Sequence, residues 1–122
     1  MMLKLSRKNL EVWKYSLELI ELIYRITRNF PKSELFGLII QLRRASISVT
    51  SNISEGLSRT SKIEKCRFLE IARSSLVEID AQIEISLRLK YISQEELPQI
   101  DKLINELFAM LTTLSNKIKS KN

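Results

Sequence analysis

The sequence predicts an all-α fold, an up-down-up-down antiparallel four-helix bundle in one domain that covers residues 1–122. Three observations point to this fold. The chain has only two glycines and two prolines, so little of it is suited to turns. Apolar residues recur at steps of three and four, the spacing of one helix face, whereas strand-like alternation is scarce. The periodic segments have short connections, which make successive helices antiparallel.

The first helix is expected over residues 10–28. Asn9 is a suitable N-cap, and Pro31 prevents the residue before it from staying helical. This segment has two apolar seams whose centres lie about 160° apart around the helix axis. One seam comprises Leu10, Trp13, Leu17, Ile20 and Tyr24, and the other comprises Val12, Tyr15, Leu19, Leu22 and Ile26. A helix in a small bundle needs one seam, so the second is predicted to meet further helices or another subunit.

The second helix is expected over residues 33–57. Gly56 suits a left-handed C-terminal cap, and Gly37, near the helix start, suits a close approach of another helix. Besides its core stripe, this helix carries a second apolar patch on the far side, formed by Phe36, Ile40 and Ile47. The second helix is therefore also apolar on two faces.

The third helix is expected over residues 61–90. Ser61 and Glu64 have the spacing of a capping box, in which each side chain caps a backbone N–H at the helix start. The helix has one apolar stripe and mostly charged residues elsewhere, so it is predicted to be an outer wall of the bundle.

The fourth helix is expected over residues 94–119, with a second capping box formed by Ser93 and Glu96. Pro98 lies too deep to be a first-turn proline if Ser93 is the cap. Either an isolated turn precedes the helix, or its start is kinked.

The two apolar faces of the first and second helices predict a cyclic homo-oligomer. At about 25 cal/mol per Å², covering a few hundred Å² per subunit is worth several kcal/mol before the entropy of association is counted. The alternative is a monomer whose own helices cover both faces. The candidate interface or register residues are Tyr15, Leu19, Leu22, Phe36, Ile40, Arg44, Ile47, Asn52 and Glu55.

A row of polar side chains flanks the core stripe of the second helix. Its members recur at three- and four-residue steps: Gln41, Arg44, Ser48, Asn52, Glu55 and Arg59. The structural interpretation is a hydrogen-bonded ladder that fixes the register of the helices, within one subunit or between two. The alternative makes Arg44 and Arg59 ligand contacts.

The composition argues against catalysis. The chain has no histidine, which disfavours His-assisted hydrolases, most catalytic zinc sites and histidine-dependent helical ribonucleases. Gly37 and Gly56 are too far apart to form a glycine-rich phosphate loop. We therefore expect no enzymatic activity, no cofactor and no metal.

The single cysteine, Cys66, cannot form an internal disulfide and favours a reducing compartment. No apolar run approaches the roughly 18 residues that span a membrane. Residues 1–9 lack the continuous apolar stretch of a signal peptide. A cytoplasmic protein with no membrane partner is expected.

The net charge of +6 favours an anionic partner. In an antiparallel bundle the chain start, the connection between the second and third helices and the C-terminal end share one end, which collects ten of the 20 basic residues. We call its candidate nucleic-acid-binding residues the basic pole: Arg7, Lys8, Arg59, Lys62, Lys65, Arg67, Lys117, Lys119 and Lys121. Phosphates would bind there without base reading and with steep salt dependence. The alternative is that the charge serves solubility.

Several short blocks, in order, carry a family resemblance. They are Leu-Glu-Val-Trp at 10–13, Phe-Pro-Lys at 30–32, Phe-Gly-Leu at 36–38, Gln-Leu-Arg-Arg at 41–44 and Asn-Ile-Ser-Glu-Gly at 52–56. Over residues 9–118 the chain resembles the bacterial four-helix bundle family of 23S rRNA intervening-sequence proteins. Ser46 and Ser54 stand where that family usually has alanine.

The resemblance implies an up-down bundle that assembles as a ring-like homopentamer. It also implies a bacterial gene, sometimes located within an intervening sequence of ribosomal RNA genes. A related branch is similar to the accessory protein of diversity-generating retroelements, which binds a reverse transcriptase and nucleic acid.

Two functional hypotheses follow. The first is a non-enzymatic oligomer that binds RNA or DNA without sequence preference through the basic pole. The second is a protein-interaction scaffold, or an accessory subunit for a partner such as a reverse transcriptase, whose positive charge is incidental.

Overall fold

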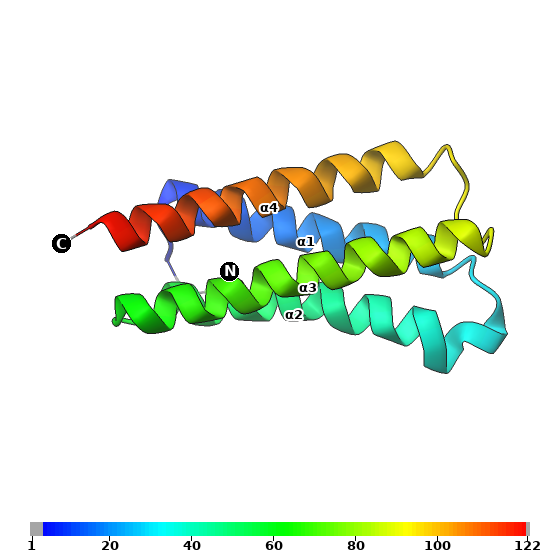
Figure 1. The fold of residues 1–122 in the computed structure, drawn as a ribbon, viewed down its shortest axis with the longest axis horizontal. Helices are drawn as coiled ribbons and strands as arrows, with labels where there is room; N and C mark the ends of the chain where they lie inside the picture. The colour runs from blue at the N-terminus through cyan, green and yellow to red at the C-terminus, as the bar shows by residue number, and fades with distance from the viewer. Residues whose placement is uncertain (1–3, 122) are drawn as a thin grey trace.

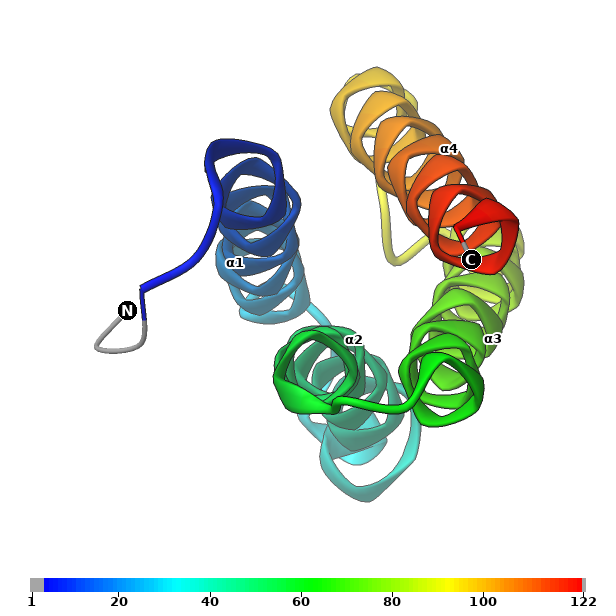
Figure 2. The ribbon, with the colours of Figure 1, turned by 90° about the vertical axis from the view of Figure 1, so that its left-hand side faces the viewer.

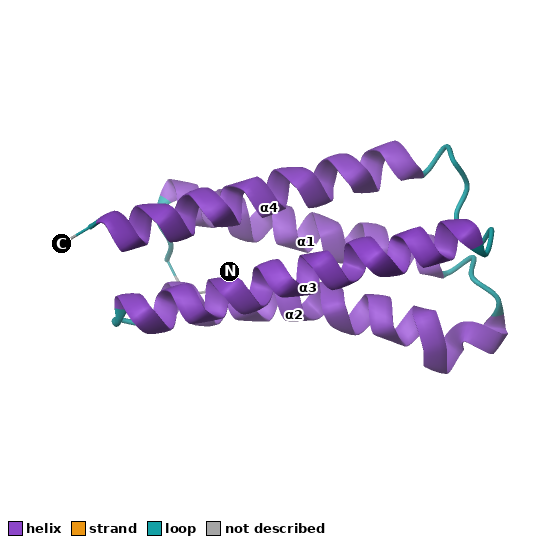
Figure 3. Cartoon of the chain, in the orientation of Figure 1, coloured by secondary structure: helices purple, strands orange, loops and turns teal. Residues whose placement is uncertain are grey.

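The structure, a computed structural model, describes residues 4–121 and is all-helical over that range (Figures 1 and 3). The long helices are α1 (Arg7–Thr27), α2 (Ile40–Ser58), α3 (Lys62–Arg88) and α4 (Leu97–Ser120), and two short turns, η1 (Lys32–Glu34) and η2 (Leu35–Ile39), precede α2. The prediction of an all-α, four-helix fold is confirmed.

Each helix packs against the next one along the chain, and α4 packs back against α1. The end-on view in Figure 2 shows the helices following one another in chain order around the bundle axis. In Figure 1 the chain runs from left to right along α1 and α3 and from right to left along α2 and α4. The start of α1, the α2–α3 connection and the end of α4 consequently lie at one end of the molecule.

All four helices contribute to one apolar core. Its fully buried large side chains include Leu19, Ile23, Leu42, Val49, Ile53, Leu69, Leu76, Ile79, Ile100, Leu107 and Leu111. No described helix is long and apolar enough to cross a membrane.

Of the two seams on α1, one faces this core. Val12, Leu19 and Leu22 are buried by the chain's own helices, whereas Trp13 and Tyr24 of the other seam are half-buried. Leu19 and Leu22, two of the candidate interface or register residues, have exposed fractions of 0% and 4% within a single chain, so they belong to this core and offer no surface to a second subunit.

The start of α1 lies earlier than predicted. The Ser6 hydroxyl accepts a hydrogen bond from the backbone N–H of Asn9 at 3.3 Å, so Ser6 is the N-cap and Asn9 belongs to the first turn. An N-cap side chain must accept a hydrogen bond from a free backbone N–H of the first turn, and the Ser6 hydroxyl does this in place of the Asn9 side chain.

The predicted second helix is broken at Gly37, whose backbone angles of φ −111° and ψ −114° are not helical. The Glu34 carboxylate caps the new start by accepting from the N–H of Leu38 at 3.2 Å. A Cβ added at Gly37 would meet only the Glu34 side chain, so the expectation that Gly37 permits a close approach of another helix is wrong.

That role belongs to Gly56, which is buried inside α2 rather than acting as a left-handed cap. A Cβ added at Gly56 would lie 3.1 Å from the carbonyl oxygen of Lys65 and 3.3 Å from the Leu69 side chain. The missing side chain therefore allows the backbones of α2 and α3 to approach closely.

The remaining helix ends follow from local capping. Ser61 caps α3 by accepting from the Glu64 N–H at 3.3 Å, as the capping-box spacing predicts. Before α4, the Ser93 N–H and hydroxyl both donate to the Glu96 carboxylate at 3.2 Å. This closes an isolated turn, and α4 then begins at Leu97 with Pro98 in its first turn. Of the two alternatives for this region, the isolated turn is the one observed.

Candidate nucleic-acid interface

Four segments bring the basic pole together. Arg7 and Lys8 open α1, and Arg59 directly follows α2. The first turns of α3 supply Lys62, Lys65 and Arg67, and the end of α4 supplies Lys117, Lys119 and Lys121. These segments share one end of the bundle (Figure 1).

Five of these residues line a hollow of about 420 Å³, which we call the lysine pocket. They are Lys8, Lys62, Lys65, Lys117 and Lys121. Part of the wall is apolar, formed by Leu57, Leu114 and Ile118. None of the described residues that line the pocket is acidic.

The amines of the lysine pocket act on one another. Hydrogen bonding with Lys8, then charge repulsion from Lys8 and Lys121, lower the pKa of Lys117 from its ordinary value. Like charges held together in this way favour any anion that comes between them.

Lys65 has a structural partner. Its Nζ donates to the carbonyl oxygen of Leu57 near the end of α2, at 3.4 Å. A cation near a helix C-terminus is stabilised by the partial negative charge of the terminal carbonyls.

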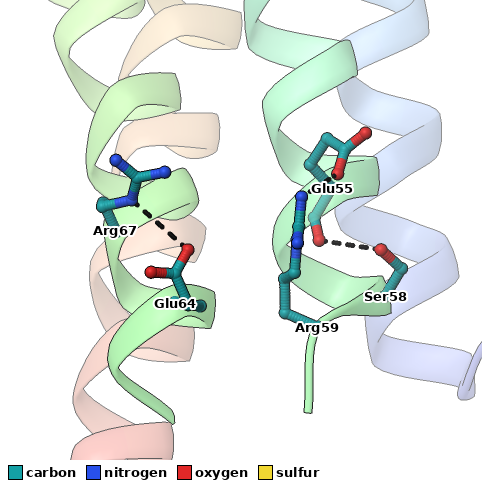
Figure 4. Close-up of polar contacts among 5 residues, drawn as sticks. All are labelled: Glu55, Ser58, Arg59, Glu64 and Arg67. Atoms are coloured by element: carbon teal, nitrogen blue, oxygen red, sulfur yellow. Dashed lines mark hydrogen bonds and ion pairs between the residues drawn. The ribbon is translucent and has the colours of Figure 1, made fainter. Parts of the chain in front are cut away.

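Two of the three arginines of the basic pole, Arg59 and Arg67, have acidic partners (Figure 4). Arg59 pairs with Glu55 at 3.1 Å, and Arg67 pairs with Glu64 at 3.4 Å. Both guanidinium groups lie over the ring of Phe68, at 4.8 and 5.0 Å from its centre. The pole therefore contains a lysine pocket with no acidic residue in its described lining and, apart from it, a pair of arginines over Phe68, while Arg7 and Lys119 belong to neither.

The spacing of Phe68 along α3 is that of a core residue, but its ring is half-buried and faces the two guanidinium groups. The sequence does contain a signal for this arrangement. Arg67 directly precedes Phe68 and Arg59 lies shortly before α3, and the guanidinium group of Arg binds the face of an aromatic ring.

The polar row of α2 faces α3 of the same chain. The Ser48 and Ser75 hydroxyl oxygens lie 3.0 Å apart, and the Asn52 amide donates to the Ser48 carbonyl at 2.8 Å. Gln41 accepts from Gln82 at 3.4 Å. The three remaining members of the row, Arg44, Glu55 and Arg59, are exposed, and Glu55 pairs with Arg59.

The exposed apolar surface is only partly where the sequence predicts it. Phe36 and Ile47 are exposed, as expected, with exposed fractions of 87% and 43%, while Tyr15 and Ile40 are half-buried. The other large exposed apolar side chains are Leu35 in η2 and Ile63, Ile71, Val77, Ile85 and Leu89 in and just after α3. Charged residues are still the majority among the exposed positions of α3, as expected, but large apolar side chains interrupt them.

Comparison with known proteins gives a consistent assignment. The family model described as 23S rRNA-intervening sequence protein matches residues 8–113. A search of curated proteins returned no significant match. Among solved structures, the chain is similar to a protein of unknown function from the S23 ribosomal protein family of Bacteroides thetaiotaomicron. The TM-score is 0.79 at 24% identity, covering 93% of this chain and 99% of the other, a likeness of fold. With most of its length matched by the family model, the chain belongs to the 23S rRNA-intervening sequence protein family.

Proposed function

We propose that this chain is a non-enzymatic protein that binds RNA or DNA without sequence preference through its basic pole. The observation that carries the proposal is the lysine pocket, because five lysines line it and no described lining residue is acidic. Phosphates attract such a surface at long range and replace its counterions on contact. The absence of histidine from the whole sequence supports the non-enzymatic part, and the single cysteine supports a cytoplasmic location.

The contacts offered at this end suit phosphates better than bases. Lysine amines recognise phosphates as point charges, and paired arginines such as Arg59 and Arg67 bind phosphate oxygens through two N–H groups. The Phe68 ring is covered by these guanidinium groups. A base would have to displace them in order to stack on the ring, so binding is expected to be largely independent of sequence.

The subunit is proposed to be an up-down-up-down antiparallel bundle that assembles into a cyclic homo-oligomer. The support is the exposed apolar surface: Phe36 is 87% exposed, and α3 carries Val77 and Ile85 at 57% and 48%. A large exposed apolar patch commonly marks an interface between proteins. A ring with aligned subunits would also place the basic poles side by side and multiply their field.

Light scattering after gel filtration tests the oligomer. The chain is expected to run as a multiple of its subunit mass, and Phe36→Ser with Ile85→Ser is expected to shift it toward the monomer. The matched control replaces two exposed polar residues, Ser51→Ala in α2 with Ser74→Ala in α3. A wild-type protein with the mass of one chain over a wide concentration range would exclude the oligomer.

Fluorescence anisotropy with mixed-sequence RNA and DNA tests the binding function. Replacing Arg59, Lys62 and Lys65 with Ser is expected to weaken binding at least about tenfold. It should also lower the slope of log affinity against log salt by about two to three, because each phosphate contact contributes roughly 0.9 to that slope.

The matched control removes the same charge from the other end of the bundle. Arg28, Lys32 and Arg88 are exposed there, at the end of α1, in η1 and at the end of α3. Their replacement with Ser should leave the salt slope nearly unchanged. Equal losses in the two triple variants would mean that net charge, rather than the basic pole, determines binding.

A second candidate function is a scaffold for another protein, and the exposed apolar side chains of α3 favour it. This scaffold would retain one partner after nuclease treatment and would lose it on replacement of Val77 and Ile85 with Ser. The nucleic-acid-binding protein would instead lose its co-purifying material to nuclease or salt.

A further inference from the structure

The lysine pocket adjoins a second hollow. Lys8, Asn9, Leu114 and Lys117 line both. The second hollow has a volume of about 370 Å³ and lies between α1 and α4. We call it the α1–α4 slot. Its remaining lining residues are Glu11, Val12, Ala109, Met110 and Thr113.

The two hollows differ in chemistry. The lysine pocket has five amines around its wall, whereas the slot combines apolar surface from Val12, Ala109 and Met110 with the polar side chains of Glu11 and Thr113. A ligand that fills both must have a strongly anionic end joined to a body with apolar faces and polar edges. A phosphorylated nucleoside has this make-up.

A phosphate at the end of a nucleic-acid strand fits such a pocket better than a phosphate inside the strand. An internal phosphodiester carries one negative charge and has a sugar on each side, which limits how many amines can surround it. A terminal phosphate monoester carries up to two charges near neutral pH and leaves three oxygens free for charge-assisted hydrogen bonds. A concave site lined by several lysines therefore favours the end of a strand over its interior.

The N-terminal ends of two helices strengthen the attraction of this end of the bundle for anions. Ser6 caps α1 and lines the lysine pocket, and the first residue of α3, Lys62, lines it as well. Helix N-termini carry partial positive charge and free N–H groups. The C-terminal ends of α2 and α4 carry partial negative charge, which opposes this effect. The bond from Lys65 to the Leu57 carbonyl oxygen partly offsets the negative charge at the end of α2.

We infer that the lysine pocket receives the terminal phosphate of a nucleic-acid strand, with the terminal nucleoside in the α1–α4 slot. This inference rests on the proposed function and makes it more specific, because it assigns a preference for phosphorylated ends within binding that is otherwise independent of sequence. A free nucleotide or polyphosphate presents the same chemistry, so the experiment separates these sources.

The test compares two single strands of one sequence that differ only in a 5′-phosphate or a 5′-hydroxyl, each labelled at the other end. Fluorescence anisotropy at moderate salt is expected to show about tenfold tighter binding of the phosphorylated strand, since charge-assisted hydrogen bonds are roughly twice as strong as neutral ones. Lys8→Ser with Lys117→Ser should abolish that ratio.

Arg67→Ser with Lys119→Ser is the matched control. It removes the same charge from the basic pole, but neither residue lines the lysine pocket. This variant should weaken binding of both strands alike and keep the tenfold ratio. Circular dichroism checks that both variants fold.

Competition separates the sources of the phosphate group. Displacement of the phosphorylated strand by adenosine monophosphate or tripolyphosphate at similar concentrations supports a pocket that takes the phosphate group in any form. Displacement only by a phosphorylated strand supports recognition of a strand end. Equal affinity for the two strands, or a ratio that persists in Lys8→Ser with Lys117→Ser, would overturn the inference while leaving the proposed function intact.

If neither strand binds, the proposed function fails. Binding of tripolyphosphate then tests by itself whether the lysine pocket takes a phosphate group. The ligand is expected to raise the melting temperature of the wild type, because a ligand that binds only the folded state stabilises it. No rise, or an equal rise in the Lys8→Ser with Lys117→Ser variant, would overturn the inference.

Discussion

The indole N–H of Trp13 donates a hydrogen bond to the hydroxyl oxygen of Ser54 at 3.1 Å, joining α1 to α2. Ser54 is one of the two serines that stand where the family resemblance leads us to expect alanine, and its hydroxyl has a structural partner here. The other departure is different: the buried Ser46 hydroxyl donates to the carbonyl oxygen of Arg43 in its own helix, at 2.8 Å.

We predict that Ser54→Ala lowers the free energy of unfolding by about 1 kcal/mol, because it removes the acceptor of a partly buried donor. Ser46→Ala serves as the control and should be near neutral, since the lost bond lies within one helix. Urea denaturation followed by tryptophan fluorescence measures both. Similar effects in the two variants would show that the Trp13 bond adds no stability.

Gly56→Ala is expected to destabilise the fold by about 1 kcal/mol. The new methyl group would lie 3.1 Å from the Lys65 carbonyl oxygen, so α3 must move away from α2. This cost opposes the usual gain of about 1 kcal/mol when alanine replaces a helical glycine. Ser51→Ala, on the exposed side of the same helix, should be slightly stabilising. A more stable Gly56→Ala protein would mean that α3 adjusts freely.

Lys90→Gly is expected to raise the free energy of unfolding by about 1 kcal/mol, because Lys90 has a left-handed backbone with φ of 65°. It follows α3, and the next residue, Tyr91, donates its N–H to the Ser86 carbonyl as in a helix cap.

The matched control for this change is Lys102→Gly, which replaces an exposed lysine in the second turn of α4. It should lower the free energy of unfolding by about 1 kcal/mol. Thermal or urea denaturation of the pair therefore yields opposite signs. A loss of stability in both variants would contradict the cap.

The lowered pKa of Lys117 has a consequence for stability at alkaline pH. Because the unfolded chain holds the proton more tightly than the folded chain, the free energy of unfolding should rise with pH between the folded pKa and the ordinary value of 10.5. Below that window the repulsion opposes folding fully, and above it the effect is gone. Lys8→Met should raise the pKa of Lys117 and flatten this rise.

The titration of Tyr15 changes the free energy of unfolding in the opposite direction over the same alkaline pH range. The pKa of Tyr15 is raised, chiefly by the charge of Glu106, so its contribution to stability declines as pH rises. The difference between wild type and Lys8→Met therefore isolates the lysine pair. NMR titration of the lysine side chains measures the pKa directly, and an unchanged value in Lys8→Met would exclude the repulsion.

The fold could be predicted from the sequence where local chemistry determines it. The apolar period of three and four gives the helices, and Ser61 with Glu64 gives the start of α3. The gathering of positive charge at one end follows from short connections and the spacing of Lys8, Lys62 and Lys117 along the chain.

What could not be predicted depends on how the helices are rotated and how closely they approach. Whether Leu19 or Trp13 faces the core depends on the rotation of α1 against its neighbours, and both seams have the right spacing. Gly37 and Gly56 exchanged their expected roles because a glycine signals either a break or a close contact, and only the packed α3 distinguishes them. Likewise, Phe68 separates the arginines from the lysine pocket through side-chain positions that no spacing specifies.

The lysine pocket is assembled from segments near both ends of the chain, since Ser6 and Lys121 line the same hollow. A purification tag or fluorescent protein fused at either terminus would therefore sit beside the pocket, and a polyhistidine or acidic tag could obstruct it. Inserting the label into the connection between α3 and α4, at the far end of the molecule (Figure 1), keeps this region open.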